Sequence, residues 1–411
     1  MKKAIIFVGV FGIFGVLRAQ SPFSLNWHGF VNPHYYADSR SVVGGREDMM
    51  LFYPKPILRD SLGNDLNDGW QADMLAITAR LGLTINGPDI WGAKTKAYIE
   101  GDFTGSTNAT INDLRLRHAY IDMTWTHRGR IGRYDSVVST HRLLAGQYWY
   151  PMVIHEIMPM TNPLNMGAPF HCYARQPQVR YEYSIPGIEI VAAATWQLDN
   201  MSQGLLNGVP TSSTLFARHS LVPEVNLQMR WKTDKVFFGI AANVKTIQPE
   251  VTTVATVLKH TELHSSLSWS LFGKVKLGEV TLKAQTLLNN SLYEGCSLGG
   301  YLMLADSSFE DWHFNTVWLD VERNSGRWRP GIFLGFAYNH KEEDHPQHFP
   351  STPPIVFGRG YDIKYLWRIQ PRLTYTTLKG LSFTGEAEYT RAGYDEPVGN
   401  LRLSLSMVYA F

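Results

Sequence analysis

Apolar and polar residues alternate with a period of two along most of the chain, in segments of about ten residues. The last segment is the clearest. From Leu401 to Phe411 the odd positions are Leu, Leu, Leu, Met, Tyr and Phe, and the even ones are Arg, Ser, Ser, Val and Ala. Segments near Leu75, Val225, Leu263 and Leu381 repeat the alternation. Because successive side chains of a strand point to opposite faces, each segment predicts a strand with one apolar face.

Alternation alone also fits a soluble β-sandwich that has one wet face. Three further features favour a membrane barrel: the segments number roughly sixteen, short and long connections alternate between them, and aromatic residues end the apolar faces. The aromatic residues concerned are Trp231, Tyr389, Tyr409 and Phe411. Residues 21–411 are therefore predicted to form an all-β fold, a closed transmembrane antiparallel β-barrel of about 16 strands. Its short turns would be periplasmic, its long loops extracellular, and its outer face in contact with outer-membrane lipid.

The first twenty residues read as an export signal. Lys2 and Lys3 precede an apolar stretch from Ala4 to Leu17, and Ala19 is a small residue at a cleavage position. About 14 apolar residues are too few to span a bilayer as a helix. Residues 1–20 are therefore predicted to be a signal peptide.

Composition agrees with an exported barrel and excludes other classes. Charged residues make up 18%, below the roughly 25% of soluble domains, and aromatic residues 13%. Lys and Arg total 38 against 36 Asp and Glu, a net charge of +2, with no basic cluster of the kind that binds nucleic acid. Past residue 20 no apolar run reaches the ~18 residues of a membrane helix.

The polar faces of such a barrel line a water-filled lumen. Basic residues assigned to these faces outnumber acidic ones roughly two to one, which favours anions. The alternative is that paired charges only keep the wall wet. The basic residues chosen as pore-lining are Arg80, Lys94, Lys96, Arg115, Arg117, Arg180, Arg230, Lys364 and Arg368, and the same face assignment adds Lys245, Lys283, Arg372, Arg391 and Arg402.

The third long loop, residues 150–174, is apolar and rich in Met and Pro. An exposed loop of this kind would be sticky, so we expect it to fold into the barrel mouth and narrow the pore, with His155 and Glu156 in the constriction. A structural plug or a contact between subunits is the alternative. The two cysteines, Cys172 and Cys296, fall in long loops, and whether they pair is left open.

Two stretches depart from the alternation. Arg115 and Arg117 share a face with the apolar Ala119 and Ile121, so either a bulge changes the facing or both arginines lie beyond the bilayer. Residues 126–143 are longer and more polar than a periplasmic turn requires, which suggests an insertion at that rim.

Motifs for catalysis or cofactor binding are lacking from the sequence. It contains no G-x-S-x-G, H-E-x-x-H or phosphate-binding glycine loop. The histidines and acids of residues 339–348 have no ligand spacing and indicate a solvated loop. We expect no enzyme activity, no cofactor and no metal site.

Four motifs resemble the DcaP-like porins of Gram-negative outer membranes: E-G-D-F at residues 100–103, L-R-L-R-H-A-Y at 114–120, L-A-G-Q-Y-W at 144–149 and Q-P-Q-V-R-Y at 176–181. The resemblance implies a sixteen-stranded homotrimeric channel that passes small, often anionic, solutes. It also implies that Arg117 and Arg180 belong to the pore wall and that the loop after Trp149 forms the constriction. Residues 126–143 depart from the family pattern. The end of the leader and the long apolar loops resemble those of Bacteroidota proteins.

Two functions follow as hypotheses. The first is an outer-membrane porin, a passive channel for small hydrophilic solutes with a mild anion preference. The second is a non-conducting barrel that acts as an adhesin or as a scaffold subunit of an outer-membrane assembly. They differ in whether residues 150–174 leave an opening.

Overall fold

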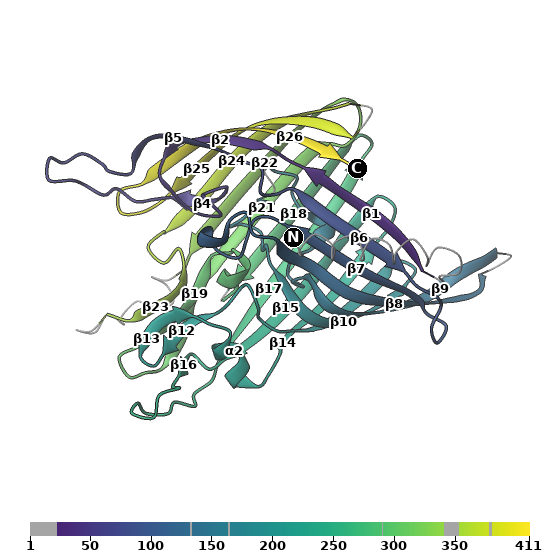
Figure 1. Cartoon of the computed structure of the whole chain (residues 1–411), viewed down its shortest axis with the longest axis horizontal. Coiled ribbons are helices and arrows are strands. Elements are labelled where there is room, and N and C mark those ends of the chain that lie inside the picture. Colours follow the sequence, from purple (N-terminus) through teal and green to yellow (C-terminus); the bar gives the residue numbers. More distant parts are fainter. Residues whose placement is uncertain (1–22, 132–133, 163–164, 290, 341–352, 378–379) are drawn as a thin grey trace, which may run out of the picture.

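The computed structural model describes residues 23–411 except 132–133, 163–164, 290, 341–352 and 378–379. The expected signal peptide lies outside these residues, as does most of the histidine-rich loop. The described chain forms a closed barrel, in which the first and the last strand pair with each other. Large loops lie at one rim (Figure 1). Within the described residues, no helix is long and apolar enough to cross a membrane.

The wall is one antiparallel sheet of 18 strand segments, which form 16 spanning strands because the first two spanning strands are each interrupted once. Each strand pairs with the next along the chain, and the last strand closes the barrel by pairing with the first. The segments are β1 (Ser24–Val31) with β2 (His34–Arg40), β5 (Asp68–Leu75) with β6 (Arg80–Asn86), β7 (Lys94–Asp102), β8 (Arg115–Ile131), β9 (Tyr134–Trp149), β10 (Arg175–Ile185), β11 (Ile188–Thr195), β14 (Glu224–Lys232), β15 (Val236–Ile247), β17 (His264–Leu277), β18 (Val280–Asn289), β21 (Phe314–Arg323), β22 (Trp328–Asn339), β24 (Tyr365–Thr376), β25 (Leu381–Ala392) and β26 (Val398–Ala410).

Burial follows the alternation of the sequence. In β26, Leu403 and Leu405 are exposed on the outside, whereas Arg402 and Ser404 are buried on the inside. A closed sheet with an apolar outer face satisfies its backbone groups internally, as a membrane-spanning sheet must. The predicted all-β, sixteen-stranded barrel is confirmed.

The change of facing in β8 is a β-bulge. Glu100 of β7 pairs with His118 and Gly101 pairs with Leu116, so Arg117 is the extra residue on β8. Arg117 and His118 are consequently both buried. Of the two explanations left open by the sequence, the bulge is the correct one.

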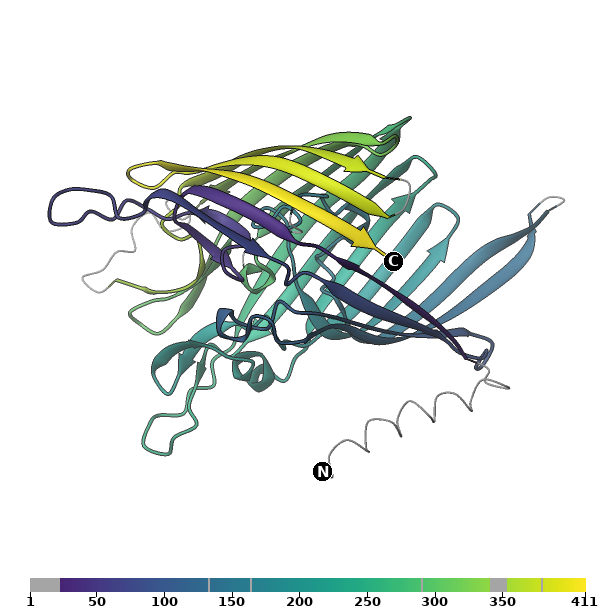
Figure 2. The same ribbon diagram turned by 45° about the horizontal axis from the view of Figure 1, so that its top comes forward.

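The insertion expected at residues 126–143 takes the form of a prolonged hairpin of β8 and β9, as far as the described residues show. The ladder continues from the pair Trp125–His141 to the pair Ile131–Tyr134. The hairpin extends past the neighbouring turns at the periplasmic rim, at the right of Figure 2. A ribbon outside the bilayer needs no continuous apolar face, which explains why polar residues predominate in its sequence.

The long connections carry most of the remaining structure, and the short ones are tight turns at the opposite rim (Figure 1). The alternation of long and short connections is therefore confirmed. The additional elements are β3 (Val42–Gly45), β4 (Met50–Pro54), η2 (Asn108–Thr110), η3 (His155–Ile157), β12 (Gln203–Leu206), β13 (Val209–Ser212), α2 (Leu215–Ser220), β16 (Glu250–Val251), η4 (Tyr293–Gly295), β19 (Gly299–Met303), β20 (Phe309–Trp312) and β23 (Ile355–Arg359).

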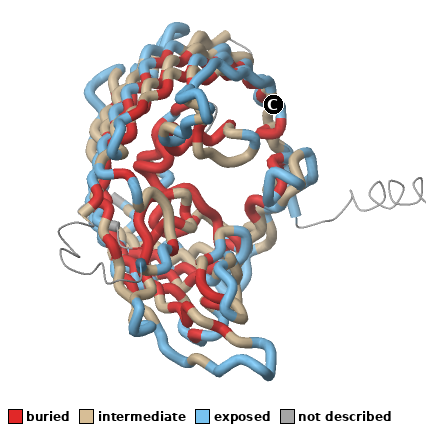
Figure 3. Tube along the Cα trace, turned by 90° about the vertical axis from the view of Figure 1, so that its left-hand side faces the viewer, coloured by how far each residue is buried: buried red, intermediate tan, exposed pale blue. Residues whose placement is uncertain are grey.

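The main hydrophobic core lies inside the barrel. It joins side chains of the inner wall, such as Phe333, to those of the loops at residues 50–53, 150–174 and 292–302. Viewed along the barrel, buried chain segments cross the interior of the ring (Figure 3). Loops therefore occupy part of the lumen.

Candidate functional site: the barrel lumen

The loop at residues 150–174 is held against the inner wall by cations that bind its backbone. Lys274 Nζ donates to the carbonyl of Glu156 at 2.8 Å, and Lys283 Nζ donates to that of Met158 at 3.0 Å. Arg368 Nη1 donates to the carbonyl of Ala168 at 2.7 Å. Such charge-assisted bonds to carbonyls satisfy loop backbone that the lumen would otherwise leave unpaired.

Side chains of the loop also fit the wall. Phe170 is fully buried, and Gly335 of β22 gives it room, because a Cβ at Gly335 would lie 2.7 Å from its ring. His171 Nδ1 lies 2.6 Å from Gln285 Oε1. Burial lowers the pKa of His171 to about 4, so it is neutral at physiological pH. The loop is packed as protein interior and not as a solvated strand.

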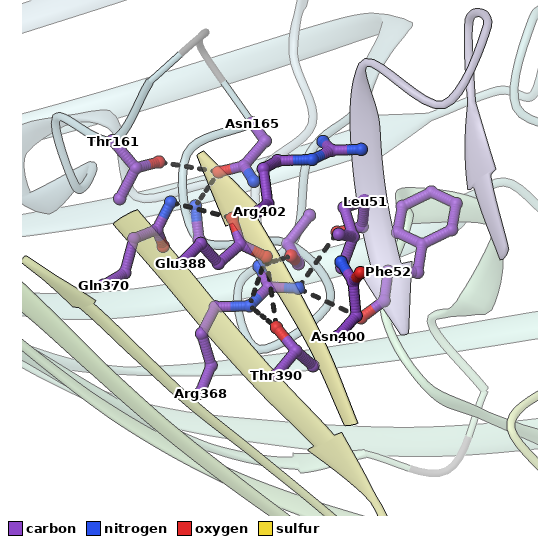
Figure 4. A network of polar contacts seen from close by, with 12 residues as sticks. Leu51, Phe52, Thr161, Asn165, Arg368, Gln370, Glu388, Thr390, Asn400 and Arg402 are labelled. Atoms are coloured by element: carbon purple, nitrogen blue, oxygen red, sulfur yellow. Dashed lines mark hydrogen bonds and ion pairs between the residues drawn. The ribbon is translucent and has the colours of Figure 1, made fainter. Parts of the chain in front are cut away.

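The first long connection folds inward as well, through the β3–β4 hairpin. Arg368 Nη2 donates to the carbonyls of Leu51 and Phe52, both at 3.1 Å. The Nε atom of the same guanidinium lies 3.0 Å from a carboxylate oxygen of Glu388 and 2.8 Å from Thr390 Oγ1. Figure 4 shows this arginine joining two inner loops to β25.

Beside these loops lies a cavity of about 330 Å³ with a strongly basic lining. Six arginines and three acidic residues line it. The arginines are Arg46, Arg80, Arg115, Arg117, Arg175 and Arg359, and the acidic residues are Asp102, Asp199 and Glu294.

Two of the three acidic residues are already engaged. Asp102 accepts from Arg117 Nη1 at 2.8 Å and from Arg115 Nη2 at 3.0 Å, and Glu294 pairs with Lys245 at 2.6 Å. By contrast, Arg117 Nη2, Arg175 Nη1 and Arg359 Nη1 are buried and have no hydrogen-bond partner among the described residues. The cavity therefore presents guanidinium donors that its own carboxylates do not satisfy.

The pKa of Tyr173, at the end of the loop at residues 150–174, shows the effect of the positive charges in this cavity. Burial opposes ionisation of its phenol, but the guanidinium groups of Arg117, Arg175 and Arg80 overcome that effect and lower its pKa to about 7. The Arg175 guanidinium lies 5.2 Å from the centre of the Tyr173 ring. The ionisation of the phenol and the charges of the arginines therefore depend on each other.

The residues expected to line the pore take different positions. Arg80, Arg115 and Arg117 line the cavity. Arg180 and Arg230 are buried on the inner wall: Arg180 pairs with Glu182 at 2.6 Å, and Arg230 with Glu156 at 3.0 Å. His155 lies beside Glu156 at 3.2 Å.

The remaining expected residues lie nearer the rims or behind the loops. Lys94 is exposed and pairs with Asp89 at 2.8 Å, and Lys96 lies 3.4 Å from Asp122. Lys364 is exposed just before β24, whereas Arg368 is buried behind two inner loops.

The face assignment from the sequence was wrong at Arg391. Arg391 shares the outer face of β25 with Tyr389, and hydrogen bonds link it to Tyr389 and Tyr365. The assignment also missed buried carboxylates that neutralise the wall, notably Asp38, which pairs with Arg402 at 2.6 Å, and Asp320, which pairs with Arg372 at 2.7 Å. The basic excess is therefore concentrated at the cavity and does not extend along the whole wall.

Three of the cavity arginines and Tyr173 were not expected as site residues. Arg46 and Tyr173 lie in loops, Arg359 lies in the short strand β23, and Arg175 is the first residue of β10. The alternation of a spanning strand carries no information about such positions. The only signal was the position of Arg175, directly before the Q-P-Q-V-R-Y motif.

Comparison of the fold with solved structures identifies the class of protein to which this barrel is similar. No protein-family model and no curated protein matches the chain. The outer membrane channel DcaP of Acinetobacter baumannii is similar in structure, with a TM-score of 0.68, 17% identity, and coverage of 95% of this chain and 97% of that one.

Two other solved porins share the architecture. The anion-selective porin from Comamonas acidovorans gives a TM-score of 0.54 at 10% identity, over 95% of this chain and 100% of that one. Salmonella typhi OmpF, in a complex with daunomycin, gives 0.52 at 10% identity, over 95% and 98%. The chain has the fold of an outer-membrane porin, and its closed barrel with an apolar outer face belongs in the outer membrane. The resemblance to DcaP-like porins is confirmed at the level of the fold. The Bacteroidota lineage stays a prediction.

Proposed function

We propose that the protein is a passive channel for small hydrophilic solutes, with a mild preference for anions. The observation that carries the proposal is the cavity in the lumen, where arginines exceed carboxylates. Buried guanidinium nitrogens of Arg117, Arg175 and Arg359 have no partner there among the described residues. A cationic wall lowers the barrier for anions and raises it for cations.

The constriction is proposed to form where residues 150–174 cross the lumen beside this cavity. Tyr173 and Arg175 come from the end of this loop and the start of β10, so the loop brings the basic cluster to the narrowed passage. Glu156 adds little negative charge there, because it is paired with Arg230. A solute would pass between the apolar loop and the arginines.

Assembly as a homotrimer is proposed from the resemblance to the DcaP-like porins. The outer faces carry exposed apolar side chains around the barrel, for example Trp27 and Leu405, which suit either lipid or another subunit. Chemical cross-linking of the protein in native membranes should give a ladder that ends at three subunits. A ladder that ends at one subunit would contradict this assembly.

The non-conducting barrel remains a second candidate, and one observation favours it. The hydrophobic core joins residues 150–174 to the walls and to two other inner loops, as a plug would. In that case the cavity would be a dead end and the barrel would serve as an adhesin or scaffold.

Liposome swelling separates the two candidates. Proteoliposomes that contain the refolded protein should swell in isotonic solutions of small neutral and anionic solutes, and more slowly with a cationic solute of equal size. Swelling no faster than that of empty liposomes, from protein whose heat-modifiable mobility shows a folded barrel, would favour the plugged barrel.

A further inference from the structure

A second basic feature lies at the extracellular rim, outside the lumen. Helix α2 and the loop after β16 enclose an open groove of about 940 Å³ beside the ends of β14, β15 and β17. Figure 1 shows α2 and β16 at this end of the barrel, next to β14. The basic residues that line the groove are Arg218, His219, Lys259 and His260, and no carboxylate of the described chain is part of its lining.

The groove continues the lipid-facing surface of the barrel. The outward residues of β14 begin with Val225, and those of β17 include Leu267, both of which are exposed. Leu221 and Leu263 lie at alternate positions just before these two strands, on the extracellular side, and line the groove. Exposed apolar side chains therefore continue from the outer face of these strands into the groove.

Its apolar side chains are open to the surroundings. Leu221 is 90% exposed and Leu263 is 52% exposed, and both Val254 and Val257 of the facing loop are also exposed. Large apolar side chains are seldom left in water as a group beside cations unless something covers them. A lipid headgroup with its acyl chains offers both kinds of contact.

The charges of the groove are available to an anion. Arg218 and His219 are exposed in the last turn of α2, and Lys259 is exposed in the facing loop. The acidic neighbours, Glu250 and Glu262, line an adjoining hollow that shares Lys259 and His260 with the groove, and Glu250 lies 3.0 Å from His260 there. Arg218 and Lys259, which are always or normally charged at neutral pH, are the principal cations of the groove.

From these contacts we propose that the groove binds a phosphate-bearing lipid of the outer leaflet. Arg218 and Lys259, supported by His219, hold the phosphate, while an acyl chain lies along Leu221 and Leu263. Lys and Arg side chains near a membrane surface attract anionic lipid, each independently of the other. Removal of both cations should therefore weaken binding about tenfold or more.

The experiment measures lipid binding by native mass spectrometry of the full-length barrel in a neutral detergent. The probes are diphosphorylated lipid A, a zwitterionic phosphatidylcholine of similar chain length, and inorganic phosphate. The test variant is Arg218→Gln with Lys259→Gln. Its matched control is Lys232→Gln with Lys235→Gln, which removes two exposed lysines at the other end of the same strands.

We expect the wild type and the control to retain lipid A about tenfold more strongly than the test variant does, and to retain phosphatidylcholine weakly. Leu221→Gln with Leu263→Gln should also weaken lipid A binding, without changing the response to inorganic phosphate. Equal lipid A binding by the test variant and the wild type would overturn the proposal. So would equal retention of phosphatidylcholine and lipid A, or inorganic phosphate binding that accounts for the affinity without an acyl chain.

Two controls separate a loss of lipid binding from a loss of folding. The charge-conserving variant Arg218→Lys with Lys259→Arg should bind lipid A as the wild type does, and all variants should show heat-modifiable mobility. Loss of binding in the charge-conserving variant, with a folded barrel, would mean that geometry and not charge holds the lipid, which also contradicts the proposal.

Discussion

Two groups of arginines face the same lumen and do different work. Arg368 and Arg402 have every guanidinium nitrogen engaged, by Glu388 or Asp38 and by carbonyls of the inner loops. In the cavity, Arg117, Arg175 and Arg359 each keep a buried nitrogen without a partner among the residues that the structure describes. The first group holds loops in place, whereas the second group keeps hydrogen-bond donors for a solute, although Arg117 also pairs with Asp102. The net charge of a pore wall therefore does not predict ion selectivity unless the partner of each cation is known.

The largest expected effect is on stability, and it comes from replacing an arginine that holds the inner loops. Arg402→Met should destabilise the barrel by about 3–5 kcal/mol, because it leaves Asp38 as a buried carboxylate without its cation. Urea unfolding in detergent, followed by heat-modifiable mobility, measures this change. Arg323→Gln, which removes an exposed pair with Glu279, is the control and should cost under about 1 kcal/mol. Similar losses in both variants would contradict the distinction.

The next effect concerns the cavity group. Arg175→Gln should lower the anion-to-cation permeability ratio by roughly two- to fivefold, since one unit charge a few ångströms from an ion is worth about 1 kcal/mol in water. Arg180→Gln should change it less, because Arg180 is already paired with Glu182. Reversal potentials under a salt gradient measure both. Equal shifts would show that pairing does not govern which arginines act on solutes.

The packing of the inner loop gives a third test. Gly335→Ala would place a Cβ 2.7 Å from the Phe170 ring, so the loop must move. Overpacking of this kind costs about 1–3 kcal/mol, and we expect a changed single-channel conductance with the barrel still folded. Gly385→Ala in β25 is a matched control, because a Cβ there has ordinary contacts. An unchanged conductance in Gly335→Ala would mean that residues 150–174 do not set the width of the pore.

The smallest expected effect is on pH dependence. The pKa of Tyr173 is about 7, so the neutral phenol predominates below that pH and the phenolate above it. The phenolate offsets one arginine charge, so anion preference should fall as pH rises from about 6 to 8. Tyr173→Phe should flatten this dependence. Reversal potentials at pH 6 and pH 8 measure this change. If anion preference still falls with pH in Tyr173→Phe, the titrating group is not Tyr173.

The barrel could be predicted from the sequence because period-two alternation, aromatic ends and connection lengths are imposed locally by the bilayer. Leu401 to Phe411 showed both faces of a strand directly. The bulge at Arg117 could be narrowed to two explanations but not decided, since it depends on pairing with Glu100 and Gly101.

The candidate site was predictable only in part, for a different reason. Arg80 followed from the alternation, and Arg115 and Arg117 were assigned to the pore wall although their segment departs from it. Arg46, Arg359 and Tyr173 reach the cavity through loop folding. No local pattern encodes that folding. The expected two-to-one excess of basic residues also missed carboxylates whose partners lie far apart in the chain, such as Asp38 with Arg402. Contacts between distant segments decide which charges remain unpaired.

Cavity arginines that keep guanidinium nitrogens without a partner among the described residues should make this lumen anion-preferring. The most direct measurement is the reversal potential of single channels of the wild-type protein in a planar bilayer under a tenfold KCl gradient. We expect discrete conductance steps and a reversal potential on the chloride side. Discrete steps with a reversal potential on the potassium side would contradict it.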